Sequence, residues 1–295
     1  MQRYSQQRPS TSTKGSIQIS EQGKRLTLKG DGWQIQTNEQ GELTSLQYNG
    51  KEMLAQQPAL LFSGFRSISN DRRNANAQPN VKRQGYTWRT SEAKDTVIVC
   101  LDEVIEQGKT SVPLQMSYRI TADGHIQVDA TFDNSHNSDF PRLGLQSILA
   151  AGLENVEWLG RGPIENYPDR HDAAFVGRYQ TTVDGMEEEY IKPQSMGERT
   201  ETRWLKLTDK TGKGLCITAN GTAFSFSALH YTDEELWQTK YHFELPRIRR
   251  QETVLHLDAA MRGIGNGSCG PGPMRKYEMP AGPISYSFTI SPIAQ

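Results

Sequence analysis

Residues 114–132, LQMSYRITADGHIQVDATF, indicate the fold most directly. Apolar residues occupy every second position in 114–120, and they do so again in 126–132. Asp123-Gly124 lies between the two runs and is a residue pair typical of tight turns. The stretch therefore predicts an antiparallel hairpin in which each strand buries one face against a core.

The same period of two recurs along the chain, with turn residues such as Asn49-Gly50 between the runs. Only Thr232–Thr239 looks helical, with Thr232 as its N-cap. We therefore predict an all-β protein: a large two-sheet antiparallel β-sandwich over residues 16–295, after a polar tail or linker over residues 1–15. Further apolar alternations occur at residues 17–19, 26–28, 33–35, 205–207, 215–217, 224–226, 255–257 and 284–290.

The charge balance excludes some classes of partner. Among 295 residues, Lys and Arg number 33 and Asp and Glu number 34, which gives a net charge of −1. A nucleic-acid-binding domain usually carries a strong basic excess. The sequence has no signal-peptide pattern and no apolar run of the length that spans a membrane, about 18 residues or more. We expect no nucleic-acid or membrane partner, and the sequence does not indicate a compartment.

The sequence contains no spacing of cysteines or histidines that is typical of a metal site or of a disulfide framework. Cys100, Cys216 and Cys269 are odd in number and far apart, so we expect reduced, unpaired thiols rather than a disulfide framework. The six histidines lack the spacing of HxxxH or HExxH sites. We expect neither a metal nor a cofactor in this chain.

Residues 158–170, WLGRGPIENYPDR, form the densest segment of unusual residues. Its glycines and prolines require a specific backbone path. Glu165 and Asp169 could serve as the carboxylate pair of a glycosidase. Alternatively, they form ion pairs with Arg161 and Arg170 and cap loop amides, which is the interpretation that we adopt.

A second dense segment, RGIGNGSCGPGP, covers residues 262–273. Its glycines resemble a phosphate-binding loop, but the segment lacks the lysine and the following helix of such a loop. A loop that brings its backbone close to a ligand or to another domain fits better. Residues 62–80 are polar and predict a long loop that is either functional or a surface excursion.

Segment 158–170 resembles the W-x-G-x-G-P-x-E-N-Y-P-D-R signature of the last domain of β-galactosidases of glycoside hydrolase family 2. Other family-like stretches follow the same order, and together they cover roughly residues 16–293. They are Phe65-Arg66 with Asn70-Asp71, Pro141-Arg142-Leu143-Gly144, Tyr190–Arg199 with Ser195 where glutamate is usual, Leu257-Asp258, Gly263-Ile264-Gly265 and Ser268.

This resemblance implies a galactose mutarotase-like supersandwich that acts as the C-terminal domain or small subunit of a β-galactosidase. Its partners would be a catalytic TIM-barrel portion and a galactoside substrate. In the family, two glutamates on that barrel carry the chemistry, and any Mg or Na would belong there. We therefore expect no catalytic residue in this chain, and no galactoside hydrolysis by the chain alone.

The resemblance also implies roles for the two dense segments. The closing loop of the family supplies an aromatic platform for galactose, and Cys269 stands at the matching position here. Asn266, Ser268 and Cys269 are thus the expected substrate-binding residues. The other segment is expected to be structural through Trp158, Arg161, Glu165, Asn166, Tyr167, Asp169 and Arg170.

Two other functions remain open from the sequence. One is a free-standing mutarotase-like sugar epimerase, which needs a general base and a histidine acid on one concave face. His171, His230 and His242, with Glu165 or Glu244, are the candidates for those roles. The other is a carbohydrate-binding sandwich without catalytic activity.

Overall fold

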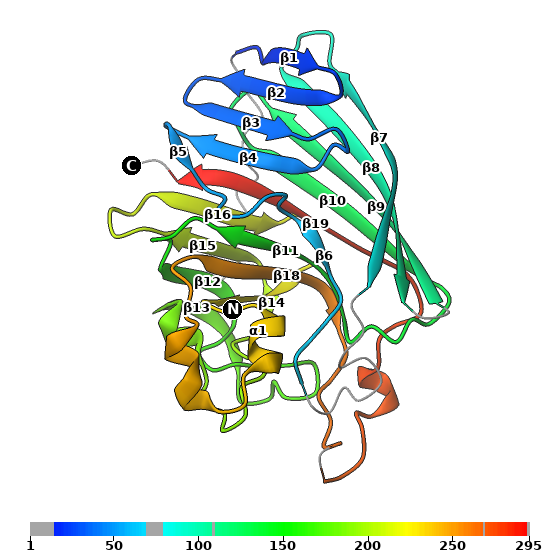
Figure 1. The fold of residues 1–295 in the computed structure, drawn as a ribbon, viewed down its shortest axis with the longest axis vertical. Helices are drawn as coiled ribbons and strands as arrows, with labels where there is room; N and C mark the ends of the chain where they lie inside the picture. The colour runs from blue at the N-terminus through cyan, green and yellow to red at the C-terminus, as the bar shows by residue number, and fades with distance from the viewer. Residues whose placement is uncertain (1–14, 69–78, 108–109, 268, 294–295) are drawn as a thin grey trace, which may run out of the picture.

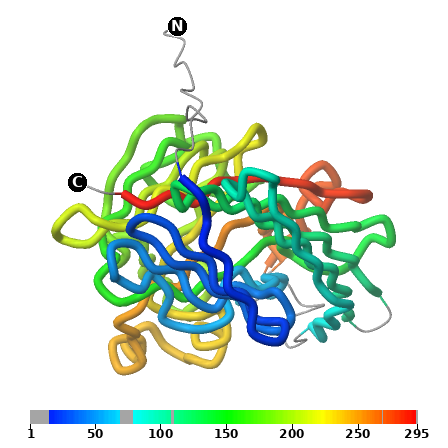
Figure 2. The backbone as a smooth tube through the Cα atoms, turned by 90° about the horizontal axis from the view of Figure 1, so that it is seen from above, coloured from blue at the N-terminus to red at the C-terminus, as the bar shows by residue number. Residues whose placement is uncertain are grey.

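The computed structural model describes residues 15–68, 79–107, 110–267 and 269–293. The strands of the described residues form two packed layers (Figures 1 and 2). One layer is a nine-stranded antiparallel sheet in the order β13-β12-β15-β16-β19-β10-β9-β8-β7. Its strands are β7 (Asn80–Thr90), β8 (Thr96–Gln107), β9 (Thr110–Thr121), β10 (Ile126–Asn134), β12 (Asn155–Gly162), β13 (Phe175–Thr182), β15 (Trp204–Thr208), β16 (Gly214–Ala219) and β19 (Gly282–Ile293).

The second layer consists of two five-stranded sheets, β1-β2-β3-β4-β5 and β14-β17-β18-β11-β6. Backbone hydrogen bonds of 2.9 Å from Ala55 to Ile148 and from Ala150 to Met53 join them. The predicted two-sheet sandwich is thus confirmed as two layers, although one layer is divided. The strands are β1 (Gln18–Gln22), β2 (Arg25–Gly30), β3 (Trp33–Thr37), β4 (Leu43–Tyr48), β5 (Lys51–Glu52), β6 (Leu61–Ser63), β11 (Arg142–Leu149), β14 (Arg199–Thr202), β17 (Phe224–Leu229) and β18 (Thr253–Met261).

The hairpin predicted from residues 114–132 is confirmed as β9 and β10. Ile120 pairs with Ile126 and Leu114 with Phe132, so the apolar sets of both strands lie on one face. Gly124 has a φ of +79°, which a turn of this kind requires and glycine adopts readily. On the other side, β19 pairs with β10 and carries the alternation of residues 284–290 onto the same face.

Helical structure is sparse in the described residues. The predicted helix is confirmed as α1 (Asp233–Gln238), and Thr232 caps it by accepting a hydrogen bond from the Glu235 backbone amide. Three short 3₁₀ turns complete the chain: η1 (Asp184–Met186), η2 (His242–Arg247) and η3 (Arg275–Tyr277). The predicted loop over residues 62–80 begins inside β6, and residues 69–78 lie outside the described residues.

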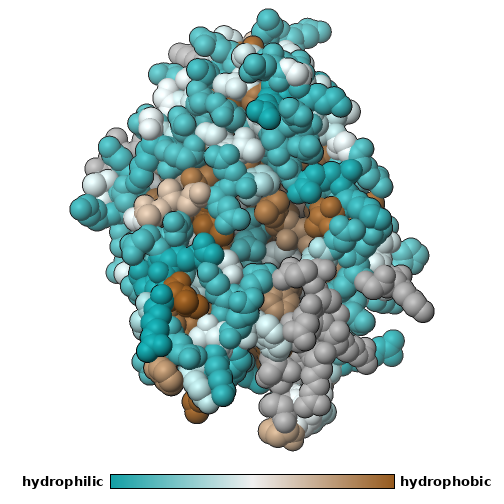
Figure 3. Space-filling view, viewed as in Figure 1, coloured by the Kyte–Doolittle hydropathy of each residue, from teal (hydrophilic) through white to brown (hydrophobic). Residues whose placement is uncertain are grey.

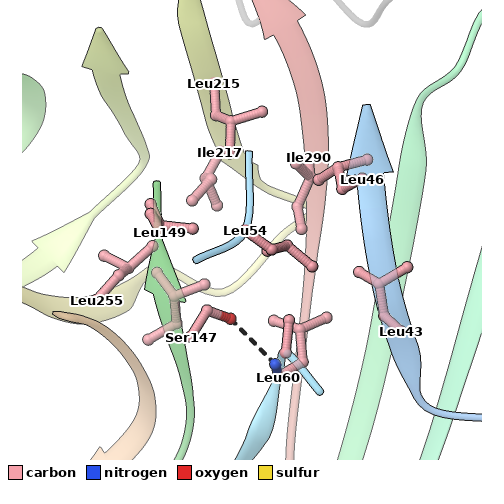
Figure 4. Close-up of a pocket in the computed structure, with 12 residues that line it drawn as sticks. Leu43, Leu46, Leu54, Leu60, Ser147, Leu149, Leu215, Ile217, Leu255 and Ile290 are labelled. Atoms are coloured by element: carbon pink, nitrogen blue, oxygen red, sulfur yellow. Dashed lines mark hydrogen bonds between the residues drawn. The ribbon is translucent and has the colours of Figure 1, made fainter. Parts of the chain in front are cut away.

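A single apolar core fills the space between the layers and includes side chains from all three sheets. Where the sheets meet, Leu43, Leu54, Leu215 and Ile290 surround a small apolar cavity (Figure 4). A polar group in its lining, the Ser147 hydroxyl, accepts a hydrogen bond of 3.0 Å from the Leu60 amide. A cavity this small and apolar is a packing gap and not a ligand site.

Candidate functional site

Segment 158–170 begins inside the nine-stranded sheet and not in a loop, because its first five residues belong to β12. Trp158 is buried there, and its indole NH donates to the Arg161 carbonyl at 3.0 Å. The rings of Tyr179 and Phe226 pack against it, with centroids 5.4 and 5.9 Å away. The tryptophan thus fixes the end of β12 before the chain turns.

After β12, two side chains of the turn bind residues 197–200. Glu165 accepts hydrogen bonds from the Gly197 amide at 3.0 Å and from the Tyr190 hydroxyl. The fully buried Asn166 accepts from the Thr200 amide at 3.0 Å and from its hydroxyl at 2.5 Å. These bonds occupy the Glu165 carboxylate with local backbone and hydroxyl donors.

The next two charged residues bind the other dense segment. Asp169 accepts hydrogen bonds from the backbone amides of Ile264 at 2.9 Å and Gly265 at 2.7 Å. Arg170 donates to the Gly265 carbonyl at 2.8 Å. A Cβ at Gly263 would lie 2.7 Å from the Asp169 carboxyl carbon, so the absence of a side chain there permits the contact.

Two arginines and a tyrosine complete this set of contacts. Arg66, which is fully buried, donates to the carbonyls of Arg262 at 2.6 Å and Gly263 at 3.2 Å. Arg161 donates to the Ala174 carbonyl at 2.8 Å and forms an ion pair with Glu201. Tyr167 joins Ile68, Met261 and Ile264 in a small apolar cluster under the loop.

The loop over residues 263–273 therefore has a fixed base and an exposed tip. Residues 263–265 are buried, whereas Asn266 and Cys269 are exposed. The Asn266 carbonyl accepts from the Cys269 amide at 3.0 Å, and the Asn266 amide donates to the Pro271 carbonyl at 2.9 Å. Ser268, also expected to bind substrate, lies outside the described residues, as do Asn70 and Asp71. The substrate-binding role of the tip stays a prediction.

Next to this loop base, a cluster of buried charges links β11, β18 and α1. Arg142 is paired with Asp233 at 2.8 Å, with Asp258 at 3.1 Å and with Glu198 at 3.8 Å. All four side chains are at most 7% exposed. A guanidinium among three carboxylates in the interior couples the segments that carry them.

The three carboxylates differ in their proton affinity. Burial raises the pKa of Asp258 to about 6, while Arg142 acts in the opposite direction. Burial also raises the pKa of Glu198 well above its usual value, and Asp258 adds to the effect. Burial acts likewise on Asp233, but Arg142 and His256 outweigh it, so the pKa of Asp233 is lowered. Asp233 is therefore the carboxylate that stays ionised over the widest pH range.

Ser63, His256 and Asp233 lie in the order of a catalytic triad. The Ser63 hydroxyl is 2.9 Å from His256 Nδ1, and His256 Nε2 is 3.6 Å from an Asp233 oxygen. However, Arg142 Nη1 lies 3.0 Å from the same Nδ1. Burial, then Arg142, lowers the pKa of His256 to about 3. A ring that resists protonation this strongly cannot act as a general base for Ser63.

Sequence reasoning missed this cluster as a unit, although it noted Arg142 and Asp258 in family-like segments. A usable signal was present in β18, where His256 and Asp258 alternate with leucines. Polar residues at every second position of an otherwise apolar strand indicate a polar face in the interior, which must be paired.

The histidines that were candidates for an epimerase are separate from their candidate bases. His230 is paired with Glu154 at 3.0 Å and His242 with Glu187 at 3.3 Å. Glu244 accepts instead from the Lys240 and Tyr241 amides. Among the described residues, no ion pair joins His171, His230 or His242 to Glu165 or Glu244. The contacts thus bring together none of the acid and base pairs considered from the sequence.

Within residues 15–68, 79–107, 110–267 and 269–293, no three side chains of His, Cys, Asp or Glu converge as a metal site would require. No helix there is long and apolar enough to cross a membrane.

Comparison with known proteins identifies the family. Residues 29–290 match the family described as beta galactosidase small chain, and the chain belongs to that family. It is 27% identical to a beta-galactosidase of Streptococcus thermophilus and 30% identical to one of Actinobacillus pleuropneumoniae. These matches cover 96% and 95% of this chain, but only 28% of each relative. The chain thus spans little more than a quarter of the relatives' length.

Solved structures with a similar fold include a galactose 1-epimerase from Lactobacillus acidophilus NCFM. The match covers 96% of this chain and 99% of that chain, with a TM-score of 0.49 and 8% sequence identity. A galactose mutarotase-like protein from Lactobacillus casei ATCC 334 also has a TM-score of 0.49, with 12% identity.

Proposed function

We propose that this chain is the small-subunit or C-terminal part of a β-galactosidase, and that it completes the galactose subsite of a catalytic portion carried elsewhere. Family membership and the names of the relatives support the assignment. The observation that carries it is the loop over residues 263–273. Two charged side chains of segment 158–170 hold its base, while its tip is exposed. A fixed base with an exposed tip suits a loop that reaches into a neighbouring site.

The chemistry of hydrolysis is assigned to the catalytic portion. A retaining glycosidase needs two carboxyl groups on either side of the scissile bond, one of them with a raised pKa. Here Glu165 and Asp169 are occupied by backbone and hydroxyl donors. The converging carboxylates around Arg142 are buried and paired. We likewise assign any Mg or Na to the catalytic portion, as the family resemblance implies.

The first experiment compares the chain alone with the chain mixed with its catalytic portion, on a chromogenic β-galactoside. The chain alone should be silent, and the mixture should turn over. Turnover by the chain alone at a typical enzyme rate, on the order of 10 per second, would refute the assignment of chemistry to another portion.

The second experiment tests the loop with Cys269→Trp in the assembled enzyme. An indole at a sugar subsite adds stacking or a clash, each worth about 0.5–1.5 kcal/mol, so KM should change several-fold in either direction. Cys269→Ser controls for loss of the thiol. Lys210→Trp, at an exposed position in the β15–β16 turn, controls for an added indole elsewhere. Kinetics unchanged by Cys269→Trp in a folded enzyme would place the loop outside the subsite.

A further inference from the structure

Exposed apolar side chains are distributed unevenly over this protein. Every large hydrophobic residue that is exposed among the described residues lies between residues 164 and 274. The described residues before Ile164, about half of the chain, contribute none. In Figure 3, separate brown and tan side chains lie at the lower left, where Figure 1 draws the orange segment that follows α1, and others lie near the centre and at the lower right. Single exposed hydrophobics are ordinary, but several large ones on neighbouring segments are less common.

Five of these residues come from neighbouring segments, and we call them the apolar end surface: Ile164, Phe175, Ile191, Tyr241 and Phe243. Ile191 is 86% exposed, Phe175 71% and Phe243 68%. Removing apolar side chains this large from water would be favourable. Aromatic residues are also enriched at the centres of protein interfaces.

Hydrogen bonds join the segments that carry these side chains. The hydroxyl of Tyr190, next to Ile191, donates to Glu165, next to Ile164. The backbone amide of His242 donates to the Ile191 carbonyl at 3.2 Å. Phe175 opens β13 and pairs with Gly162, two residues before Ile164. The five side chains are thus carried by segments that are bonded to one another.

A sugar is a poor occupant for the aromatic pair in this surface. The rings of Tyr241 and Phe243 are stacked, with centroids 5.5 Å apart and an interplanar angle of 11°. The Lys240 ammonium lies 5.0 Å from the Tyr241 ring centroid. The Phe243 ring and the Lys240 ammonium thus both lie against the Tyr241 ring, which leaves less of that ring open to a sugar. A protein surface, which takes up ring edges and aliphatic groups, fits better.

We propose that the apolar end surface docks the catalytic portion of the β-galactosidase; this inference rests on the proposed function. This chain matches 28% of each relative, so about 72% of each relative's length lies outside the match. A large protein body is therefore available to cover the apolar end surface. Segment 158–170 also joins the surface to the loop over residues 263–273, through Glu165 on one side and Asp169 on the other. One segment thus supports both features, and a large body that receives the loop tip can contact the surface as well.

The test measures binding of the purified chain to the separately purified catalytic portion, by titration calorimetry, for the wild type and for the double variant Ile191→Ser/Phe243→Ser. Both side chains are exposed, so the isolated variant should keep the wild-type unfolding temperature. A few anchor residues carry most of the affinity of an interface, so the Kd should rise on the order of a hundredfold. The control Ile98→Ser removes a partly exposed isoleucine of β8 in the nine-stranded sheet, and it should leave the Kd unchanged.

The outcomes separate this inference from the function on which it rests. If the wild type binds and the double variant binds equally well, the docking surface is wrong and the proposed function stands. If the wild type neither binds nor supports activity, both are wrong. If the double variant loses only self-association of this chain, seen by sedimentation, the occupant is a second copy and the inference is overturned.

Discussion

Replacing Asp169 by alanine should release the base of the loop over residues 263–273 without unfolding the protein. The carboxylate accepts two backbone hydrogen bonds, at 2.9 Å from Ile264 and 2.7 Å from Gly265. Bonds to a charged group contribute about 1.5–3 kcal/mol each. Asp169 is half-buried, so in the variant water can partly replace the lost hydrogen bonds. We therefore expect the free energy of local opening to fall by about 2–3 kcal/mol.

The loss should be confined to the loop because other contacts to its base persist. Arg170 still donates to the Gly265 carbonyl, and Arg66 still donates to the Gly263 carbonyl. If the whole 2–3 kcal/mol were lost from global stability, the unfolding temperature would fall by about 4–12 °C, on the scale of about 2–4 °C per kcal/mol for domains of 150–250 residues. Because the loss is local, we expect a fall below that range.

Amide hydrogen exchange measures the effect at the two donors. A loss of 2–3 kcal/mol corresponds to exchange at Ile264 and Gly265 that is roughly 30- to 150-fold faster. Asp169→Asn, which keeps one acceptor oxygen, should fall between the wild type and the alanine variant. The matched control is Asp172→Ala, since the Asp172 side chain is fully exposed. Exchange at both amides that is unchanged in Asp169→Ala would refute the proposed role of the carboxylate in holding the loop.

Three further predictions concern the buried cluster around Arg142. Arg142→Met leaves Asp233 and Asp258 without their cation, so the free energy of unfolding measured in urea should fall by about 3–5 kcal/mol. A fall of less than about 1 kcal/mol would mean that the pairs are not buried charges. Because the pKa of Asp258 is raised to about 6, its contribution to stability is complete below its unfolded pKa and is lost as the pH rises through 6. The unfolding free energy of Asp258→Asn should thus improve relative to wild type between pH 4 and pH 7, and a constant difference would contradict the raised pKa. Gly144→Ala should lower the free energy of unfolding by about 1–3 kcal/mol, since its Cβ would lie 2.0 Å from an Asp258 oxygen. The control Gly272→Ala has no neighbour within 4 Å of its Cβ and should leave that free energy unchanged.

Much of the sandwich could be predicted because alternation is a local property of the chain. The pattern of residues 114–132 defines a hairpin without knowledge of any partner. By contrast, β11 is buried on both faces and shows no simple alternation. The division of one layer into two sheets also depends on long-range pairing between Ala55 and Ile148, which no local pattern specifies.

The candidate site was predictable only in part, for a related reason. The dense glycine and proline content of segment 158–170 marked it as a defined backbone path. The partners of its side chains lie far along the chain, however, so spacing alone could not name them. Asp169 binds amides 95 and 96 residues away, and Glu165 binds an amide 32 residues away. Spacing alone therefore left a glycosidase pair open as an alternative for the two carboxylates, whereas the structure gives each of them separate partners.

The contacts of these carboxylates bear directly on where the chemistry resides. A general acid or base must present its carboxyl group to the substrate, whereas the oxygens of Asp169 are bonded to the backbone amides of Ile264 and Gly265. In this geometry Asp169 holds the base of the loop. The Glu165 carboxylate is likewise occupied, by the Tyr190 hydroxyl and the Gly197 amide. Both carboxylates of segment 158–170 thus join it to other segments of the chain, which supports our proposal that the chemistry belongs to the catalytic portion.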